Sequence, residues 1–261
     1  MRRSYRLPSQ GQSLFMNIVA VYNLKGGVGK TATAVNIAYI AARRGARTLL
    51  WDLDPQGAAT WYLGLEPQLT VKAKKLMSGK VPVGSEVRIS PYSGLNVLPA
   101  DPAYRNLDLM LDKAEDRNVL AEMLKPFSET YSLTVLDCPP SFSRLAENVL
   151  TAADAVLVPL QPTPLSLRAF EQLKECISRK EIPVRRLLPF FSMVDRRRKL
   201  HREWLRNPPA QLERLLPVDI PLASEVERMG LERAPLPLFS PKCKAAEAYA
   251  ALWNQLQRKL R

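Results

Sequence analysis

The chain has 261 residues, 46% of them hydrophobic, and this length and composition favour a single α/β domain around one large core. Its 38 lysines and arginines against 25 acidic residues give a formal net charge of +13, which favours a polyanionic partner, either nucleic acid or an anionic membrane surface, over solubility alone. The sequence lacks an apolar run of roughly 18 residues, a CxxC pair and a second histidine, which argues against a transmembrane helix, a structural zinc site and a Ser-His-Asp site.

The N-terminal stretch is basic and disfavours regular structure. Three arginines without acidic neighbours precede a proline and a glycine. We expect residues 1–15 to form a flexible basic arm, with a DNA contact as the alternative, and residues 16–261 to form the folded domain. No long apolar core follows the basic start, so a signal peptide is not expected. The three cysteines lie far apart in the sequence, which favours a reduced, cytoplasmic protein.

An apolar run over residues 18–22 predicts a buried parallel strand, and a helical pattern over residues 31–44 follows, closed by Gly45. Between them lie three glycines and two lysines. Glycines let backbone N–H groups approach an anion, and a helix N-terminus adds positive potential. We expect Lys30 to reach the β- and γ-phosphates of a nucleotide and Thr31 to hold Mg²⁺; a glycine turn that binds nothing is the alternative. The expected contacts are Gly26, Gly27, Val28, Gly29, Lys30, Thr31 and Ala32.

A second buried strand is predicted over residues 48–51, and it ends in the sequence Asp-Leu-Asp-Pro-Gln-Gly. Carboxylates at the C-terminal end of a parallel strand lie where open α/β sheets bind ligands. Asp52 is a candidate for the Mg²⁺ shell through water, and Asp54 for orienting the water that attacks the γ-phosphate. The alternative is a turn with two solvated acids.

The middle of the chain is less regular. Residues 60–93 carry several lysines and little periodicity, and we interpret them as a surface insertion. A short strand over residues 95–98 and one helix over residues 107–124 follow.

The next apolar strand, residues 131–136, runs into Asp137, which is a Walker B arrangement in which Asp137 holds Mg²⁺ through a coordinated water. Pro139 and Pro140 would stiffen the turn beside the γ-phosphate, where a nucleotide-dependent switch is expected. Cys138 and Cys176 have two interpretations, ligands of a shared iron–sulfur cluster or small buried side chains, and we favour the second.

In the C-terminal half, helices are predicted over residues 143–152 and 165–179, and strands over residues 155–158 and 187–193. The densest basic run follows, and a phosphate-binding surface and a solvated helix face are its two interpretations. The candidate DNA-binding residues are Arg196, Arg197, Arg198, Lys199, Arg202 and Arg206.

Two elements close the domain. Residues 219–221 form a short edge element, and the final helix, residues 244–260, carries an apolar stripe that we interpret as core packing and not as a membrane anchor. The stripe consists of Tyr249, Leu252, Trp253 and Leu256.

Three motifs resemble those of one family in the same order. The loop Lys25–Thr31 has a lysine directly before its glycine pair, and position 24, where the ordinary P-loop has glycine, is Leu24. This loop is similar to the deviant Walker A motif of the ParA/MinD/Soj ATPases. The run Asp52–Gly57 and the passage Leu136–Gln161 also resemble that family, and the similarity spans about residues 16–260.

The resemblance implies a doubly wound, mostly parallel sheet flanked by helices, ATP and Mg²⁺ as cofactors, and a homodimer that forms on ATP binding. Lys25 would contact phosphates bound by the partner subunit, and Asp54 would support hydrolysis. Met193, Asp195 and Pro221 would lie near the base, although Leu222 replaces the arginine that relatives carry after this proline.

The resemblance also implies a weak ATPase that is stimulated by a ParB-like or adaptor partner. Such a protein is cytoplasmic and nucleoid-associated, binds DNA nonspecifically, does not insert stably in a membrane, and positions a plasmid, a chromosome or a protein cargo. The alternatives are a membrane-surface ATPase similar to MinD and a metabolic enzyme of the same fold, such as an amidotransferase or a reductase.

Overall fold

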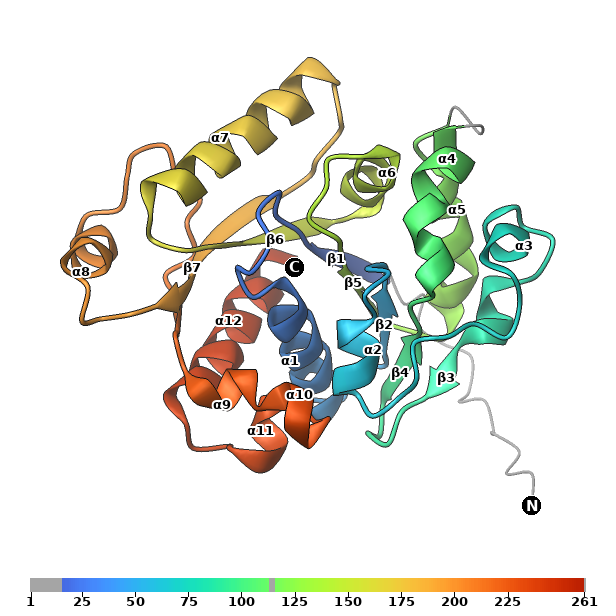
Figure 1. The fold of residues 1–261 in the computed structure, drawn as a ribbon, viewed down its shortest axis with the longest axis horizontal. Coiled ribbons are helices and arrows are strands. Elements are labelled where there is room, and N and C mark those ends of the chain that lie inside the picture. Colours follow the sequence, from blue (N-terminus) through green and yellow to red (C-terminus); the bar gives the residue numbers. More distant parts are fainter. Residues whose placement is uncertain (1–15, 113–115, 261) are drawn as a thin grey trace.

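A computed structural model describes residues 16–112 and 116–260, and within these ranges it contains an eight-stranded sheet in the order β3-β4-β2-β5-β1-β6-β7-β8 (Figure 1). The strands are β1 (Asn17–Val21), β2 (Thr48–Asp52), β3 (Arg88–Ile89), β4 (Leu95–Leu98), β5 (Leu133–Asp137), β6 (Ala155–Leu160), β7 (Leu187–Val194) and β8 (Asp219–Pro221). Neighbouring strands are parallel except for β3, which pairs antiparallel with β4 at one edge. The predicted basic arm, residues 1–15, lies outside the described residues.

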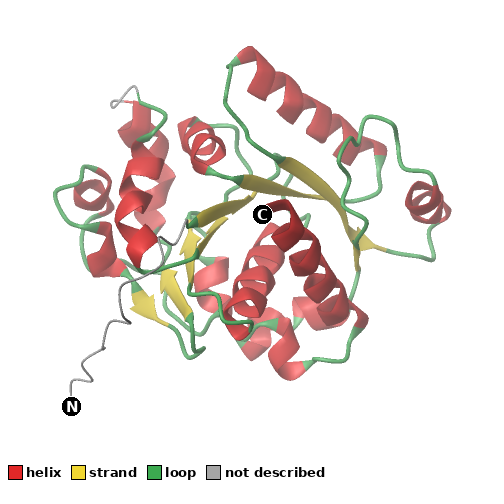
Figure 2. Cartoon of the chain, turned by 180° about the vertical axis from the view of Figure 1, so that it is seen from behind, coloured by secondary structure: helices red, strands yellow, loops and turns green. Residues whose placement is uncertain are grey.

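Helices cover both faces of the sheet (Figures 1 and 2). One face carries α1 (Lys30–Arg43), α2 (Ala58–Tyr62), α9 (Ser224–Glu227), α10 (Met229–Glu232), α11 (Leu236–Phe239) and α12 (Lys244–Leu260). The other carries α3 (Ala73–Met77), α4 (Leu107–Asp112), α5 (Val119–Leu124), α6 (Arg144–Ala152) and α7 (Pro164–Arg179). Helix α8 (Lys199–Arg206) lies at the end of the molecule beyond β7. The predicted doubly wound, mostly parallel α/β fold is confirmed.

The central strands are mostly apolar because both of their faces are covered, and β2 and β5 each end in an aspartate. Every residue of β2, β5 and β6 is buried, so these segments read as continuous apolar runs and not as alternating ones. The C-terminal ends of these parallel strands lie on the same side of the sheet, which places the loops after them side by side.

The interpretation of residues 60–93 as a surface insertion is wrong for its apolar residues. Leu69, Leu76 and Val83 are buried in the core that α4, α5 and α6 also line. The lysines of this segment are exposed, as expected. The apolar positions escape a sequence pattern because α3 is only five residues long and is flanked by turns.

The single helix expected over residues 107–124 is two helices, α4 and α5. Asp116 accepts a hydrogen bond from the backbone N–H of Asn118 at 2.8 Å, and α5 begins at the next residue. An aspartate that bonds the backbone two residues ahead favours a turn over a continuing helix.

The final helix has the predicted bounds, and Tyr249, Leu252, Trp253 and Leu256 are all buried, which confirms core packing. Cys138 is buried as expected, but Cys176 on α7 is only half-buried. Along the part of the chain that the structure covers, every helix is too short or too polar to span a lipid bilayer.

Candidate nucleotide-binding site

The predicted motifs meet at the C-terminal ends of three adjacent strands. In the register of the sheet, Val21 of β1 and Asp52 of β2 both lie beside Asp137 of β5. The glycine-rich loop leaves β1 at this point, so the loop and both acidic motifs share one edge, as the sequence predicts.

The backbone of the loop requires its glycines. Gly27 and Gly29 have φ angles of 68° and 89°, in the left-handed region that other residues rarely adopt. A Cβ on Gly29 would also lie 3.0 Å from the Ser192 hydroxyl oxygen. Asn23 fixes the start of the loop, because its side-chain amide donates to the Pro159 carbonyl at 2.7 Å and its Oδ1 accepts from the Lys25 N–H at 2.9 Å.

Lys30 is the buried cation of the site. Its ammonium donates to the Lys25 carbonyl at 3.0 Å and therefore lies inside the curve of the loop. Burial lowers the pKa of Lys30, and the charge of Asp137 opposes this shift. An ammonium held in a glycine-rich loop of this kind is a ready partner for a phosphate.

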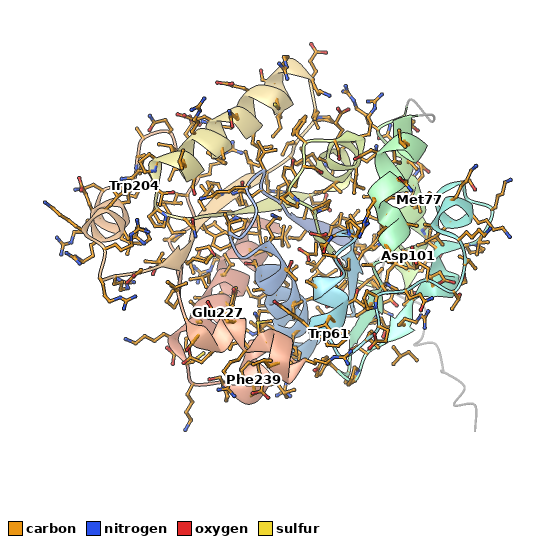
Figure 3. All side chains as sticks on the ribbon, viewed as in Figure 1. Trp61, Met77, Asp101, Trp204, Glu227 and Phe239 are labelled. Carbon is orange, nitrogen blue, oxygen red and sulfur yellow. The ribbon has the colours of Figure 1, made fainter. Side chains whose placement is uncertain are left out.

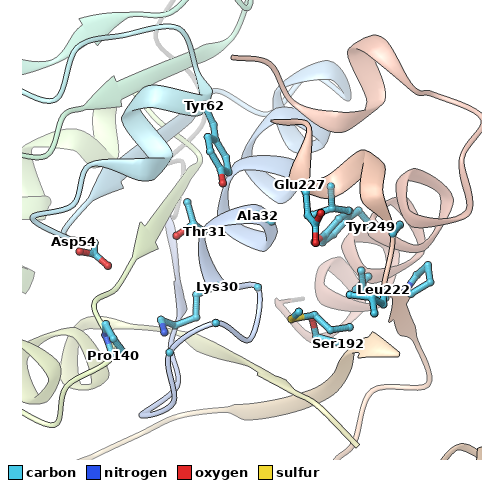
Figure 4. Close-up of a pocket in the computed structure, with 18 residues that line it drawn as sticks. Lys30, Thr31, Ala32, Asp54, Tyr62, Pro140, Ser192, Leu222, Glu227 and Tyr249 are labelled. Atoms are coloured by element: carbon cyan, nitrogen blue, oxygen red, sulfur yellow. The ribbon is translucent and has the colours of Figure 1, made fainter. Parts of the chain in front are cut away.

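A pocket of about 410 Å³ opens between the loop, α2 and the segment after β8 (Figure 4). Most of the predicted contacts line it; they are Gly26, Gly27, Gly29, Lys30, Thr31, Ala32, Asp54, Met193 and Pro221. Val28 is buried, and neither Val28 nor Asp195 lines the pocket.

Sequence reasoning missed part of the pocket wall. Tyr62 on α2 lies next to Thr31. Glu227 of α9 and Tyr249 of α12 lie close together on the side of the pocket beyond Ala32 (Figure 4). Tyr249 followed the core pattern that the sequence shows, and Tyr62 lies in a segment with little periodicity. Neither carries a signal that separates a pocket wall from ordinary packing.

Asp137 fits the role of a Mg²⁺ ligand. It is 0% exposed, and neither carboxylate oxygen accepts a hydrogen bond of normal geometry from the described part of the chain. Burial and the charge of Asp52 raise its pKa well above the usual range, and the Thr31 hydroxyl opposes this shift. A buried carboxylate whose oxygens have no well-formed hydrogen bond in the described ranges is available as a ligand for a cation. Mg²⁺ is usually held by one or two carboxylates together with water and phosphates, so a single buried aspartate beside a phosphate site is a sufficient protein contribution.

Asp52 has a different environment from the one expected for the Mg²⁺ shell. Its Oδ2 accepts from both the N–H and the hydroxyl of Thr60, each at 2.8 Å, and its Oδ1 accepts from the Asp54 N–H at 3.2 Å. Burial raises the pKa of Asp52 to about 7 against these hydrogen bonds. Asp52 thus anchors α2 and the acidic loop, and its contribution to metal binding stays a prediction.

Thr60 joins three elements, because its hydroxyl also accepts from the Ala100 N–H at 3.1 Å. Replacing Thr60 with valine, which has the same shape, should lower the free energy of unfolding by about 1–3 kcal/mol, since buried hydrogen-bonding groups lose their partner. Urea unfolding followed by circular dichroism measures this loss. The exposed Thr130→Val is the matched control, and equal stability of both variants would contradict the anchoring role.

Asp54 and Lys25 also have defined surroundings. Asp54 lines the pocket, and its Oδ1 accepts from the Gln56 N–H at 3.0 Å. The Lys25 ammonium donates to Gln161 Oε1 at 3.1 Å within the same chain. Its predicted contact with a partner's phosphates stays a prediction.

At the expected base end, Met193 lines the pocket with a φ of 54°, a strained value for a methionine. Asp195 does not line the pocket and forms an ion pair with Arg197 at 2.9 Å. The hydrogen bonds from Arg197 lower the pKa of Asp195 to about 2. The structure therefore brings Met193 and Pro221 to the pocket and leaves Asp195 outside it.

The basic run folds as the turn before α8 and the first part of that helix. Arg196 pairs with Asp219 at 2.8 Å, and Arg202 donates to the carbonyls of Arg196 and Arg197, so these arginines hold the turn. Three cations of the run are exposed and make neither an ion pair nor a side-chain hydrogen bond within the described ranges; they are Arg198, Lys199 and Arg206. Those three form the free part of the basic surface.

Comparisons with known proteins agree with this geometry. A family model described as an AAA domain matches residues 16–186. The chromosome-partitioning ATPase Soj of Treponema pallidum (strain Nichols) is 32% identical over 244 residues, which cover 90% of this chain and 94% of Soj. The chromosome partitioning protein ParA of Caulobacter vibrioides (strain NA1000 / CB15N) is 32% identical over 250 residues, covering 92% and 94%.

Among solved structures, one described as cobyrinic acid a,c-diamide synthase from Mycobacterium smegmatis, with a bound ATP analogue and magnesium, is 31% identical with a TM-score of 0.77. The match covers 94% of this chain and 95% of that one. All three proteins thus align with at least nine-tenths of this chain.

Proposed function

The chain belongs to the ParA/Soj family of partitioning ATPases, and from this premise we propose that it binds and hydrolyses ATP with Mg²⁺, pairs face to face when ATP is bound, and positions a cargo over DNA. The observation that carries the proposal is that Lys30 and Thr31 line one pocket while Asp137 lies buried at the adjacent strand end, beside Val21 of β1. ATP binding measured with and without Mg²⁺ is its direct test.

The residues have separate tasks in this proposal. The loop N–H groups and Lys30 bind the phosphates, and Thr31 and Asp137 hold Mg²⁺. When bound, Mg²⁺ neutralises charge on the β- and γ-phosphates. Asp54 orients the attacking water, and Met193 and Pro221 pack against the base. Weak activity and stimulation by a ParB-like or adaptor partner are part of the same proposal.

Lys25 serves the partner subunit in this scheme. Lys25→Ala should retain nucleotide binding by the monomer, because Lys30 supplies the phosphate contact within the chain, but ATP should no longer produce a dimer. Light scattering coupled to size-exclusion chromatography, with a non-hydrolysable ATP analogue, measures the mass. A variant that dimerises like the unsubstituted chain would refute the contact across the interface.

The proposed DNA contact is nonspecific and uses the exposed cations at the start of α8. If a dimer neutralises about 4–6 phosphates, log K should fall with log salt at a slope of about −4 to −5. A slope near zero in the presence of ATP would reject DNA binding.

Replacing the three free cations Arg198, Lys199 and Arg206 with glutamate should flatten that slope. The matched control reverses the same charge at the exposed Lys74, Lys75 and Lys80. The two sets lie at opposite ends of the molecule, near Trp204 and Met77 (Figure 3). Equal losses in both sets would mean that total charge, and not the α8 surface, governs binding.

The second candidate is a metabolic ATPase, favoured by the name of the similar solved structure from Mycobacterium smegmatis. Amide synthesis with glutamine as donor would require a nucleophilic thiol. Cys138 is buried, and burial raises its pKa well above the usual range, which disfavours the reactive thiolate. Turnover of a small carboxylic acid with ATP and glutamine or ammonia would support that candidate over partitioning.

A further inference from the structure

Gln161 lies between the nucleotide loop and the base end of the pocket. It follows β6 directly, and β6 has β1 on one side and β7 on the other. Its side-chain amide contacts both neighbours: Oε1 accepts from the Lys25 ammonium at 3.1 Å, and Nε2 donates to the Met193 sulfur at 3.5 Å. The Gln161 amide therefore connects the glycine-rich loop to the end of the pocket where we expect the nucleotide base.

The Lys25 end of this link holds a side chain whose backbone is already fixed. The Lys25 N–H donates to Asn23, and the Lys25 carbonyl accepts from Lys30. The part of Lys25 that can still move is its side chain, which carries the ammonium. In this structure it is held on its own subunit, so Lys25 must exchange the Gln161 oxygen for another acceptor before it can serve a second chain.

The Met193 end is weak and strained. A thioether is a poor hydrogen-bond acceptor, so this contact is easily exchanged. Met193 also has a left-handed backbone at the pocket wall, and its neighbour Ser192 abuts Gly29. A base that enters the pocket therefore presses on the residue to which the Gln161 amide donates.

We propose that Gln161 is a positioning residue that retains Lys25 on its own subunit until a nucleotide occupies the pocket. Contact of the nucleotide with Met193 shifts the amide, and the shift frees the Lys25 ammonium. The inference rests on the proposed function, in which the freed Lys25 binds the partner's nucleotide.

Two substitutions of Gln161 separate its contact with Lys25 from its contact with Met193. Gln161→Leu removes both contacts and should leave Lys25 free at all times. Gln161→Glu supplies only acceptors, so it should hold Lys25 more tightly through a charge-assisted hydrogen bond and lose its link to Met193. Gln172→Leu, at an exposed glutamine of α7, is the matched control.

The first experiment measures how fast Lys25 reacts with an amine-specific reagent, by mass spectrometry, with and without Mg-ADP. In the unsubstituted chain ADP should raise the Lys25 rate by on the order of 10-fold, the effect of losing one hydrogen bond to a charged group. Gln161→Leu should react at the fast rate without nucleotide, and Gln161→Glu at the slow rate with it. Slow labelling of Gln161→Leu without nucleotide would overturn the proposal, and so would an ADP-independent rate in the unsubstituted chain.

The second experiment compares ADP affinity with the ATP concentration that half-saturates dimer formation. Gln161→Glu should raise the latter by on the order of 10-fold while ADP affinity stays within about twofold. In the Lys25→Ala background Gln161→Leu should add nothing. Equal effects on both quantities would assign Gln161 to the pocket wall and overturn the proposal. A labelling response without any ATP-dependent dimer would instead refute the proposed function and leave the retention of Lys25 standing.

Discussion

Lys30→Ala should weaken ATP binding about 100-fold, enough to leave the site empty at ATP concentrations that saturate the unsubstituted chain. The ammonium lies inside the phosphate-binding loop, 3.0 Å from the Lys25 carbonyl, and is the buried cation beside Asp137. Its removal would leave nucleotide phosphates facing the carboxylates of Asp54 and Asp137 without compensation. Loss of a charge-assisted contact of about 3 kcal/mol corresponds to about a 100-fold weaker Kd. Titration with a fluorescent ATP analogue measures it.

The variant should remain folded, which makes the result interpretable. Burial is the largest influence on the pKa of Lys30 and lowers it, so the folded chain carries this charge at a cost that alanine does not incur. The melting temperature of the variant should therefore equal that of the unsubstituted chain or be slightly higher. Lys25→Ala, which removes a lysine from the same loop, is the control and should bind ATP normally as a monomer. Tight ATP binding by Lys30→Ala would contradict the phosphate site.

The site's ligand-facing residues were predictable where neighbours in sequence are neighbours in space. Lys30 and Thr31 follow from the strand, the glycines and the helix start, all within about 15 residues. Asp137 follows from an apolar strand that ends in an acid. In each case the position at a strand end fixes the direction of the side chain, so local pattern is enough.

The partners of these residues were not predictable, because they come from distant segments. Thr60 reaches Asp52 over eight residues of turn and short helix, and Gln161 reaches Lys25 over a sequence separation of 136. Tyr62 faces the pocket only because α2 docks on α10, where the Trp61 indole donates to the Gly230 carbonyl at 3.1 Å. Such contacts depend on how elements pack, and a periodic pattern carries no information about them.

Asp54→Ala should block hydrolysis while ATP binding persists. Asp54 lines the pocket opposite the base end, near Pro140, and its loop is fixed by the hydrogen bond between the Asp54 N–H and Asp52 (Figure 4). Losing a group that orients or deprotonates the attacking water typically costs about 10²- to 10⁴-fold in rate. Removing a negative charge beside the phosphates should leave the Kd for ATP equal or lower. Single-turnover release of phosphate measures the rate.

The trapped state should be visible on DNA. Because hydrolysis ends the dimer in the proposed cycle, Asp54→Ala should stay on DNA after a chase with competitor, whereas the unsubstituted chain should dissociate as ATP is consumed. Glu129→Ala removes an exposed carboxylate from the opposite edge of the sheet, before β5, and should behave like the unsubstituted chain. Asp54→Asn divides the two explanations of the role: retained hydrolysis would mean that an oxygen placed for water suffices, and lost hydrolysis would mean that the negative charge is required. A normal rate of hydrolysis in Asp54→Ala would show that Asp54 takes no part in the chemistry. Its role would then be limited to the structure of the loop that Asp52 anchors.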